Sequence, residues 1–118
     1  MLTINNEQMA VFSDQMREEF IKRTLRNLAE LFPDDPAIKD EPAMRALIEY
    51  GIGRAQAYGI SRQREVSLFI FLVKDLGADF EKRPENRWAE EILVDTELEE
   101  QEKMDVIYSR LEVAAGNL

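Results

Sequence analysis

Histidine and cysteine are both absent from the 118 residues of this chain. Histidine is the side chain most used for acid and base catalysis near neutral pH, and the cysteine thiolate is a nucleophile and a soft metal ligand. The absence of cysteine also excludes any disulfide, which is compatible with either a reducing or an oxidising compartment and slightly favours the cytoplasm. We therefore predict that the protein is not an enzyme, uses no cofactor and binds no metal.

Positive charge is also scarce. The chain has 15 Lys and Arg against 24 Asp and Glu, a net charge of −9 and a pI near 4.6. Phosphate backbones and anionic lipids attract clusters of basic residues, so we predict that neither nucleic acid nor membrane is a partner. The sequence contains neither the roughly 18 apolar residues of a membrane span nor the pattern of a secretory signal, and we expect a cytoplasmic protein.

The composition that remains is that of a globular domain. Hydrophobic residues make up 45% and charged residues 33% of the chain, which lies far from the composition of disordered proteins. No repeat, linker or low-complexity segment divides it, and a chain of this length fits one core. We predict a single domain over residues 1–118.

Apolar residues recur at helical spacing along the whole chain, and start and stop signals separate the segments. The predicted elements are a helix from Asn5 to Phe32, a second from Asp40 to Tyr58 ended by Gly59, a third capped by Ser61 and ended by Leu76, a short one holding Trp88 and Leu93, and a last one introduced by a capping box of Thr96 and Glu99. The first has an apolar stripe of Met9, Phe12, Met16, Phe20, Leu25, Leu28 and Leu31. Residues 78–86 read as a loop with Phe80 as its apolar anchor.

The most apolar stretch runs from Val66 to Leu76, and Leu68–Val73 is an uninterrupted apolar run. Such a run is also compatible with a buried strand, but no other segment shows strand alternation, so a strand would lack a pairing partner. We predict an all-α, compact bundle of four longer helices and one short helix. The hydrophobic third helix should lie at the centre, enclosed by the others.

Two glycines, Gly51 and Gly53, fall inside the second predicted helix. A glycine there costs about 1 kcal/mol relative to alanine, so close contact with another helix should compensate. A phosphate-binding glycine loop is the alternative, and it fails because neither nucleotide fingerprint is completed.

A small basic set opposes the overall charge. Arg54, Arg62 and Arg64 bracket the turn at Tyr58, where an acidic partner surface could dock through arginine and tyrosine anchors. The more ordinary interpretation is that these arginines pair within the chain.

Asp79, Phe80 and Trp88 form a second candidate. They could line a recognition groove, or they could lock the loop onto the bundle, and we favour the lock. Residues 79–105 hold eleven Asp or Glu against four Lys or Arg. We interpret this excess as a solvated face, because adjacent carboxylates on a helix point about 100° apart and do not converge on one ion.

Five segments together resemble a known family. They are Gly51–Ile60, Leu68–Leu72, Gly77–Phe80, Trp88–Leu93 and Lys103–Ile107. In their order the chain is similar to small all-helical proteins encoded in type VI secretion loci of Gram-negative bacteria. The resemblance implies an accessory role and identifies no functional residues.

The sequence therefore leads to two hypotheses. In the first, the protein is a cytoplasmic binding module, an adaptor or chaperone for a secreted effector or a spike component. In the second, it is an immunity protein that neutralises a toxin, with its acidic face against a basic cleft. The oligomeric state and the surface that binds are left open.

Overall fold

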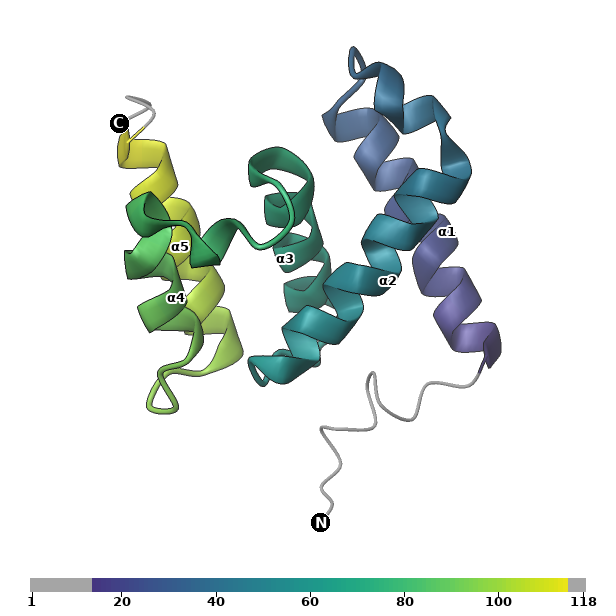
Figure 1. Cartoon of the computed structure of the whole chain (residues 1–118). Coiled ribbons are helices and arrows are strands. Elements are labelled where there is room, and N and C mark those ends of the chain that lie inside the picture. Colours follow the sequence, from purple (N-terminus) through teal and green to yellow (C-terminus); the bar gives the residue numbers. More distant parts are fainter. Residues whose placement is uncertain (1–13, 115–118) are drawn as a thin grey trace.

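The computed structural model describes residues 14–114, and the side chains of residues 14–112. Over this range the chain forms five α-helices and three short 3₁₀ helices, with no strand. The α-helices are α1 (Asp14–Leu31), α2 (Glu41–Ala57), α3 (Gln63–Leu76), α4 (Arg87–Leu93) and α5 (Glu100–Ala114) (Figure 1). The prediction of an all-α bundle with four longer helices and one short helix is confirmed.

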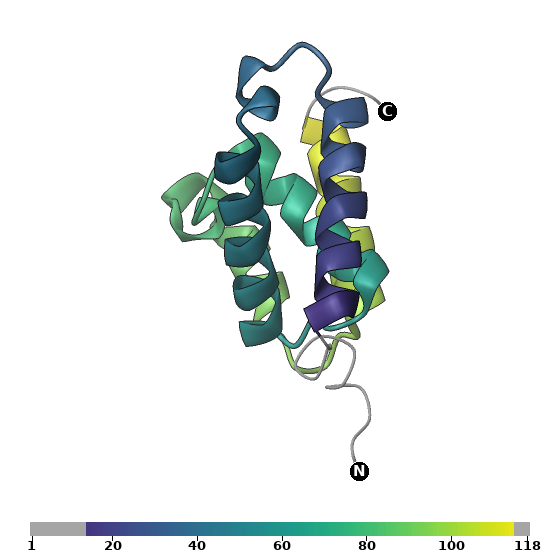
Figure 2. The same cartoon turned by 90° about the vertical axis from the view of Figure 1, so that its right-hand side faces the viewer.

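The hydrophobic helix α3 lies in the middle of the bundle. It contacts α1, α2 and α5, and α1 and α5 lie on opposite sides of it (Figures 1 and 2). Val66, Phe69, Ile70, Leu72 and Val73 are buried along α3. The strand alternative for Leu68–Val73 is excluded, because this run lies within the helix.

Helix α1 buries part of the predicted stripe, since Phe20 and Leu28 are buried and Leu25 packs against the core. Phe20, Ile21, Thr24 and Leu28 are its buried residues, whereas Met16 and Leu31 are 46% and 54% exposed. Only the middle of α1 is covered by its neighbours, so apolar residues towards either end reach solvent. The predicted start at Asn5, and Met9 and Phe12, lie outside the described residues.

Two glycines end helices as predicted, since Gly59 and Gly77 have φ of 78° and 102°. The two mid-helix glycines differ in the space around them. A Cβ on Gly51 would lie 2.6 Å from Ile70 Cγ1, whereas a Cβ on Gly53 would meet nothing within 4 Å. Close helix packing explains Gly51, and the same prediction is wrong for Gly53, which is exposed.

Two predicted helix starts are wrong. Ser61 does not cap α3; instead Glu100 Oε1 of α5 accepts hydrogen bonds from the backbone N–H groups of Ser61 and Arg62, both at 2.9 Å. The Thr96 capping box is not formed either, because α5 begins at Glu100 and the N–H of Glu99 donates to Glu102 Oε1. The acceptor for α3 comes from another helix, which a local pattern cannot reveal.

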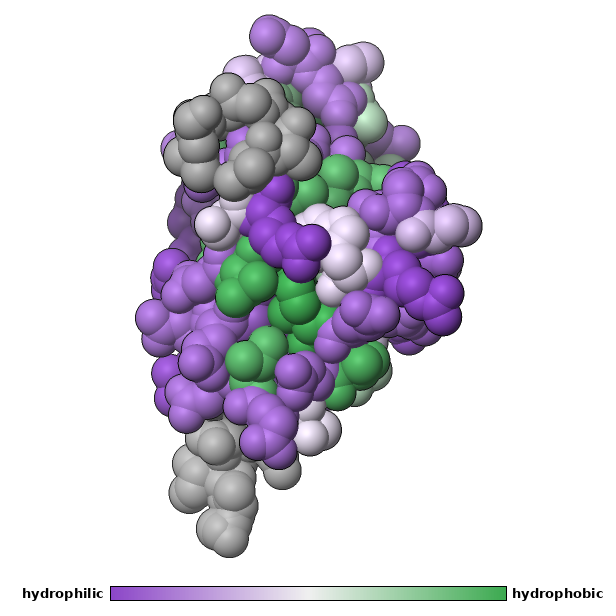
Figure 3. All heavy atoms as spheres, turned by 90° about the vertical axis from the view of Figure 1, so that its left-hand side faces the viewer, coloured by the Kyte–Doolittle hydropathy of each residue, from purple (hydrophilic) through white to green (hydrophobic). Residues whose placement is uncertain are grey.

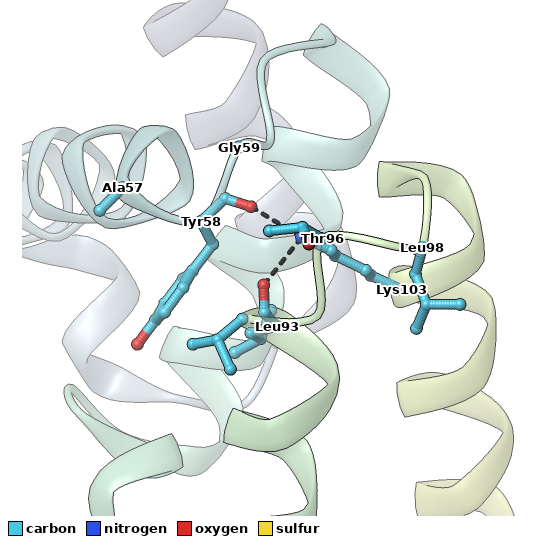
Figure 4. A pocket seen from close by; sticks show the side chains of 8 residues that line it. Ala57, Tyr58, Gly59, Leu93, Thr96, Leu98 and Lys103 are labelled. Carbon is cyan, nitrogen blue, oxygen red and sulfur yellow. Dashed lines mark hydrogen bonds between the residues drawn. The ribbon is translucent and has the colours of Figure 1, made fainter.

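Lys103, one turn after Glu100 on α5, caps the C-terminal ends of two further helices. Its Nζ donates to the carbonyl oxygens of Tyr58 at 2.9 Å and Leu93 at 2.8 Å (Figure 4). These carbonyls lie at the C-terminal ends of α2 and α4, where a cation interacts favourably with the helix dipoles. The side chain is only 6% exposed, and this burial lowers its pKa. The first turn of α5 thus joins the ends of three helices.

Candidate functional site

Arg54 and Tyr58 of α2 meet Glu81 of the short 3₁₀ helix η3 (Phe80–Lys82). Tyr58 Oη donates to Glu81 Oε2 at 2.5 Å, and Arg54 Nη2 donates to the same oxygen at 3.1 Å. Glu81 is 1% exposed. Burial, and then the hydrogen bond with Glu81, raises the pKa of Tyr58. This is a buried polar cluster that fastens the α3–α4 connection to α2.

The same connection is fastened twice more. Tyr50 Oη donates to Asp79 Oδ1 at 2.5 Å and accepts from the Asp79 N–H at 3.1 Å. Phe80 is buried with its ring centroid 6.0 Å from that of Phe69 in α3. Arg54, Tyr58, Asp79 and Phe80 therefore all belong to one set of intramolecular contacts, which we call the lock. Glu81 was not singled out from the sequence, because it lies in a charged run that reads as exposed loop.

The other two predicted arginines lie elsewhere. Arg62 Nε is 4.0 Å from Glu100 Oε2, and Arg64 Nη1 donates to Glu65 Oε2 at 2.7 Å. Together with Arg54 and Glu81, each arginine of the set lies against a different acid of its own chain. This arrangement matches the ordinary interpretation of the basic set, that its members pair within the chain.

Trp88 of α4 is partly buried against the core and lies against Arg110 of α5. Arg110 Cζ of α5 lies 4.5 Å from the Trp88 ring centroid. Hydrophobic side chains gather over these two helices (Figure 3). The partly or largely exposed apolar residues there are Trp88, Ile92, Val94 and Val106, which we call the α4–α5 strip.

A larger apolar surface lies over α3, at a place that the sequence did not indicate. The floor of this groove is one face of α3, formed by Leu68, Phe71, Leu72 and Asp75 at positions i, i+3, i+4 and i+7. Its walls come from the end of α1 and from α5. The wall residues are Leu31, Phe32, Tyr108, Leu111 and Glu112. The groove encloses about 530 Å³, and we call it the α3 groove.

The groove exists because three helices do not enclose a fourth completely. Helix α3 packs against α2 through residues such as Ile70. Its other face lies between α1 and α5, which flank α3 (Figures 1 and 2). Leu68 and Phe71 are consequently only partly buried. The expectation that the other helices enclose α3 on every side is wrong for this face.

The α5 wall is held in place by a tyrosine. Tyr108 Oη donates to the carbonyl oxygen of Leu68 at 2.6 Å, which links α5 to α3. Burial raises the pKa of Tyr108, and the nearby Asp75 carboxylate acts in the same direction. Tyr108 therefore stays a neutral hydrogen-bond donor at physiological pH, and the wall does not depend on pH there.

A second pocket, of about 460 Å³, lies beside Lys103 (Figure 4). Tyr58, Gly59, Leu93, Thr96 and Leu98 contribute to its lining. The Lys103 ammonium group already donates to two backbone carbonyls. Its polar contacts are thus accounted for by helix capping, and the α3 groove is the better candidate for a binding surface.

Within residues 14–114, no three or more Asp and Glu side chains are placed to hold a metal ion. Over the same range, no helix combines the length and the apolar character needed to cross a bilayer. Comparisons with protein-family models, with curated proteins and with solved structures give no match to this chain.

Proposed function

We propose that this chain is a non-enzymatic protein-binding module that holds a segment of a partner in the α3 groove. The observation that carries the proposal is an apolar groove open to solvent over the central helix, with Leu31, Phe71 and Leu111 among its lining. Apolar surface gains about 25 cal/mol for each Å² removed from water, so a partner that covers these side chains is stabilised there. The lack of histidine and cysteine also favours binding over chemistry.

The more specific proposal is an accessory protein of type VI secretion, acting in the cytoplasm as adaptor or chaperone for an effector or spike component. Its support is the resemblance of the five segments named above. The presence of a second apolar surface also supports it, because an adaptor needs two. On α5, Tyr108 and Glu112 line the α3 groove, whereas Val106 and Arg110 lie roughly on the other side of the helix, given about 100° per residue.

The alternative is an immunity protein that binds a toxin directly. Three exposed acids late in the chain, Glu91, Glu97 and Asp105, take part in no ion pair among the described residues. Carboxylates without internal partners are available to a basic cleft and accelerate association with it. This alternative uses the acidic surface of the chain and makes no use of the α3 groove.

Co-expression with each candidate toxin from the neighbouring genes tests both versions. An adaptor raises the level of intact toxin without inhibiting it, whereas an immunity protein restores growth and inhibits the purified toxin in equal amounts. Phe71→Glu should abolish binding by an adaptor that uses the groove, and Ala43→Glu, a charge placed on an exposed apolar site of α2 outside both apolar surfaces, is the matched control. Binding that survives Phe71→Glu unchanged would remove the groove from the proposal.

A further inference from the structure

We infer that the segment held in the α3 groove is an amphipathic α-helix of the partner with Lys or Arg beside its apolar face. The inference rests on the proposed function, because it names the chemistry of the partner at the same site. It is carried by the shape of the groove and by the sign of its charges.

The shape is that of a missing helix in the bundle. Leu68, Phe71 and Leu72 present one helical face as the floor, and α1 and α5 lie on either side of α3 (Figure 1). Helices pack 8 to 10 Å apart through such faces, by placing side chains at i, i+3, i+4 and i+7 into the facing surface. A helix lying on α3 would touch all three elements of the groove at once, and the backbone groups in its middle would be hydrogen-bonded within the helix.

The charged side chains that line the groove have one sign. Among the described residues, Asp75 and Glu112 are the charged ones in its lining, and neither takes part in an ion pair within that part of the chain. An apolar floor with acidic groups at its edge is complementary to a helix that carries basic side chains next to its apolar stripe. A second copy of this chain fits poorly, because it would bring Asp75 and Glu112 against acids in a protein of charge −9.

Two designed peptides serve as probes. Both have about 14 residues, four helical turns, and leucines at i, i+3, i+4, i+7 and i+11. One has lysines beside the leucine stripe and the other has glutamates. Binding to the full chain is followed by fluorescence anisotropy of labelled peptide. We expect the lysine peptide to bind about fivefold more tightly at low salt, the scale of two partly exposed ion pairs, with the difference shrinking as salt rises.

A pair of charge variants separates the groove from the overall charge of the protein. Asp75→Lys with Glu112→Lys should remove or reverse the preference for the lysine peptide. Glu91→Lys with Glu97→Lys changes the net charge equally, at two exposed acids that do not line the groove, and should preserve the preference. Phe71→Ala should weaken both peptides about tenfold, as expected for loss of a central anchor.

Each contrary result has its own meaning. If neither peptide binds the groove, the proposed function at this site fails as well. If both peptides bind equally and Phe71→Ala weakens both, the groove stands and the basic partner is overturned. An equal loss of preference in both charge pairs also overturns it. A concentration-dependent dimer in sedimentation that Phe71→Ala dissociates also overturns it, because the occupant is then a second copy of this chain. Tighter peptide binding after Phe12→Asp overturns it too, because the N-terminal segment of the parent chain then competes with the peptide for the groove.

Discussion

The two sides of α3 are built differently. On the side that faces α2 the backbones are so close that Gly51 has no space for a Cβ beside Ile70, and Phe69 is fully buried. On the other side Leu68 and Phe71 remain partly exposed between α1 and α5. One helix therefore serves both as the centre of the core and as the floor of the candidate site. The closed side contributes to stability, and the open side leaves apolar side chains in contact with solvent.

Truncating one phenylalanine on each side gives the largest expected contrast. Phe69→Ala should lower the free energy of unfolding by about 3 to 5 kcal/mol, because it leaves a cavity in a closed core. Phe71→Ala should cost about 1 kcal/mol or less, because part of its ring already contacts water. Urea unfolding followed by circular dichroism measures both. Equal losses for the two variants would show that the groove is closed in solution.

Lys103 tests how far the closed side depends on helix capping. Lys103→Met should lower stability by about 1 to 3 kcal/mol at neutral pH, because two carbonyl acceptors at helix ends lose their donor. Leu111→Ala, in the groove wall of the same helix, is the comparison and should cost less. A Lys103→Met protein as stable as the parent would mean that water replaces the ammonium group at both helix ends.

The buried ammonium group of Lys103 also predicts a pH dependence. Its pKa is lowered from 10.5 by burial, so the unfolded chain binds this proton more readily. Stability should therefore rise as pH increases from the lowered pKa towards 10.5, the direction that linkage requires. The raised pKa of Tyr58 and Tyr108 acts oppositely above about pH 10. The difference between parent and Lys103→Met, measured by urea unfolding below pH 10, isolates the Lys103 contribution.

Substituting alanine for each mid-helix glycine of α2 should change stability by a smaller amount, in opposite directions at the two positions. Gly51→Ala should destabilise by about 1 to 3 kcal/mol, because the added methyl group overlaps Ile70. Gly53→Ala should stabilise by about 0.5 to 1 kcal/mol, because it gains helix propensity in open space. Thermal unfolding distinguishes the signs. A stabilising Gly51→Ala would contradict the close approach of α2 and α3.

The smallest effect concerns the groove wall. Lys74 of α3 pairs with Asp35 and lies 5.0 Å from the ring centroid of the wall residue Phe32. The hydrogen bond from Lys74 holds the Asp35 pKa below 3.8, so this contribution to stability is present above pH 3.8 and disappears as pH falls through the lowered value. In urea unfolding at a series of acidic pH values, Asp35→Asn should reduce the loss of stability that the parent protein shows as pH falls below 3.8. The same loss of stability in the variant and the parent would show that the pair of Lys74 and Asp35 does not stabilise the groove wall.

The candidate site was much harder to predict than the helices. Leu68 and Phe71 were recognised as apolar residues of one helix, but not as residues left open, because periodicity shows which residues share a face and not what covers it. Of the lock around Glu81, the sequence analysis singled out Arg54, Tyr58 and Phe80. Its central acid was missed, because burial of a carboxylate depends on partners more than 20 residues away.

The sequence by itself determined that the protein is all-α, where α2 begins, where α1, α2 and α3 end, and that the Val66–Leu76 segment is central. Helical spacing, prolines and glycines act over a few residues, so these outcomes are local. Only the tertiary structure decided that Glu100 and Lys103 cap the ends of other helices and that one face of α3 stays open. Those features depend on how helices of unequal length meet in space, which no short stretch of the chain specifies.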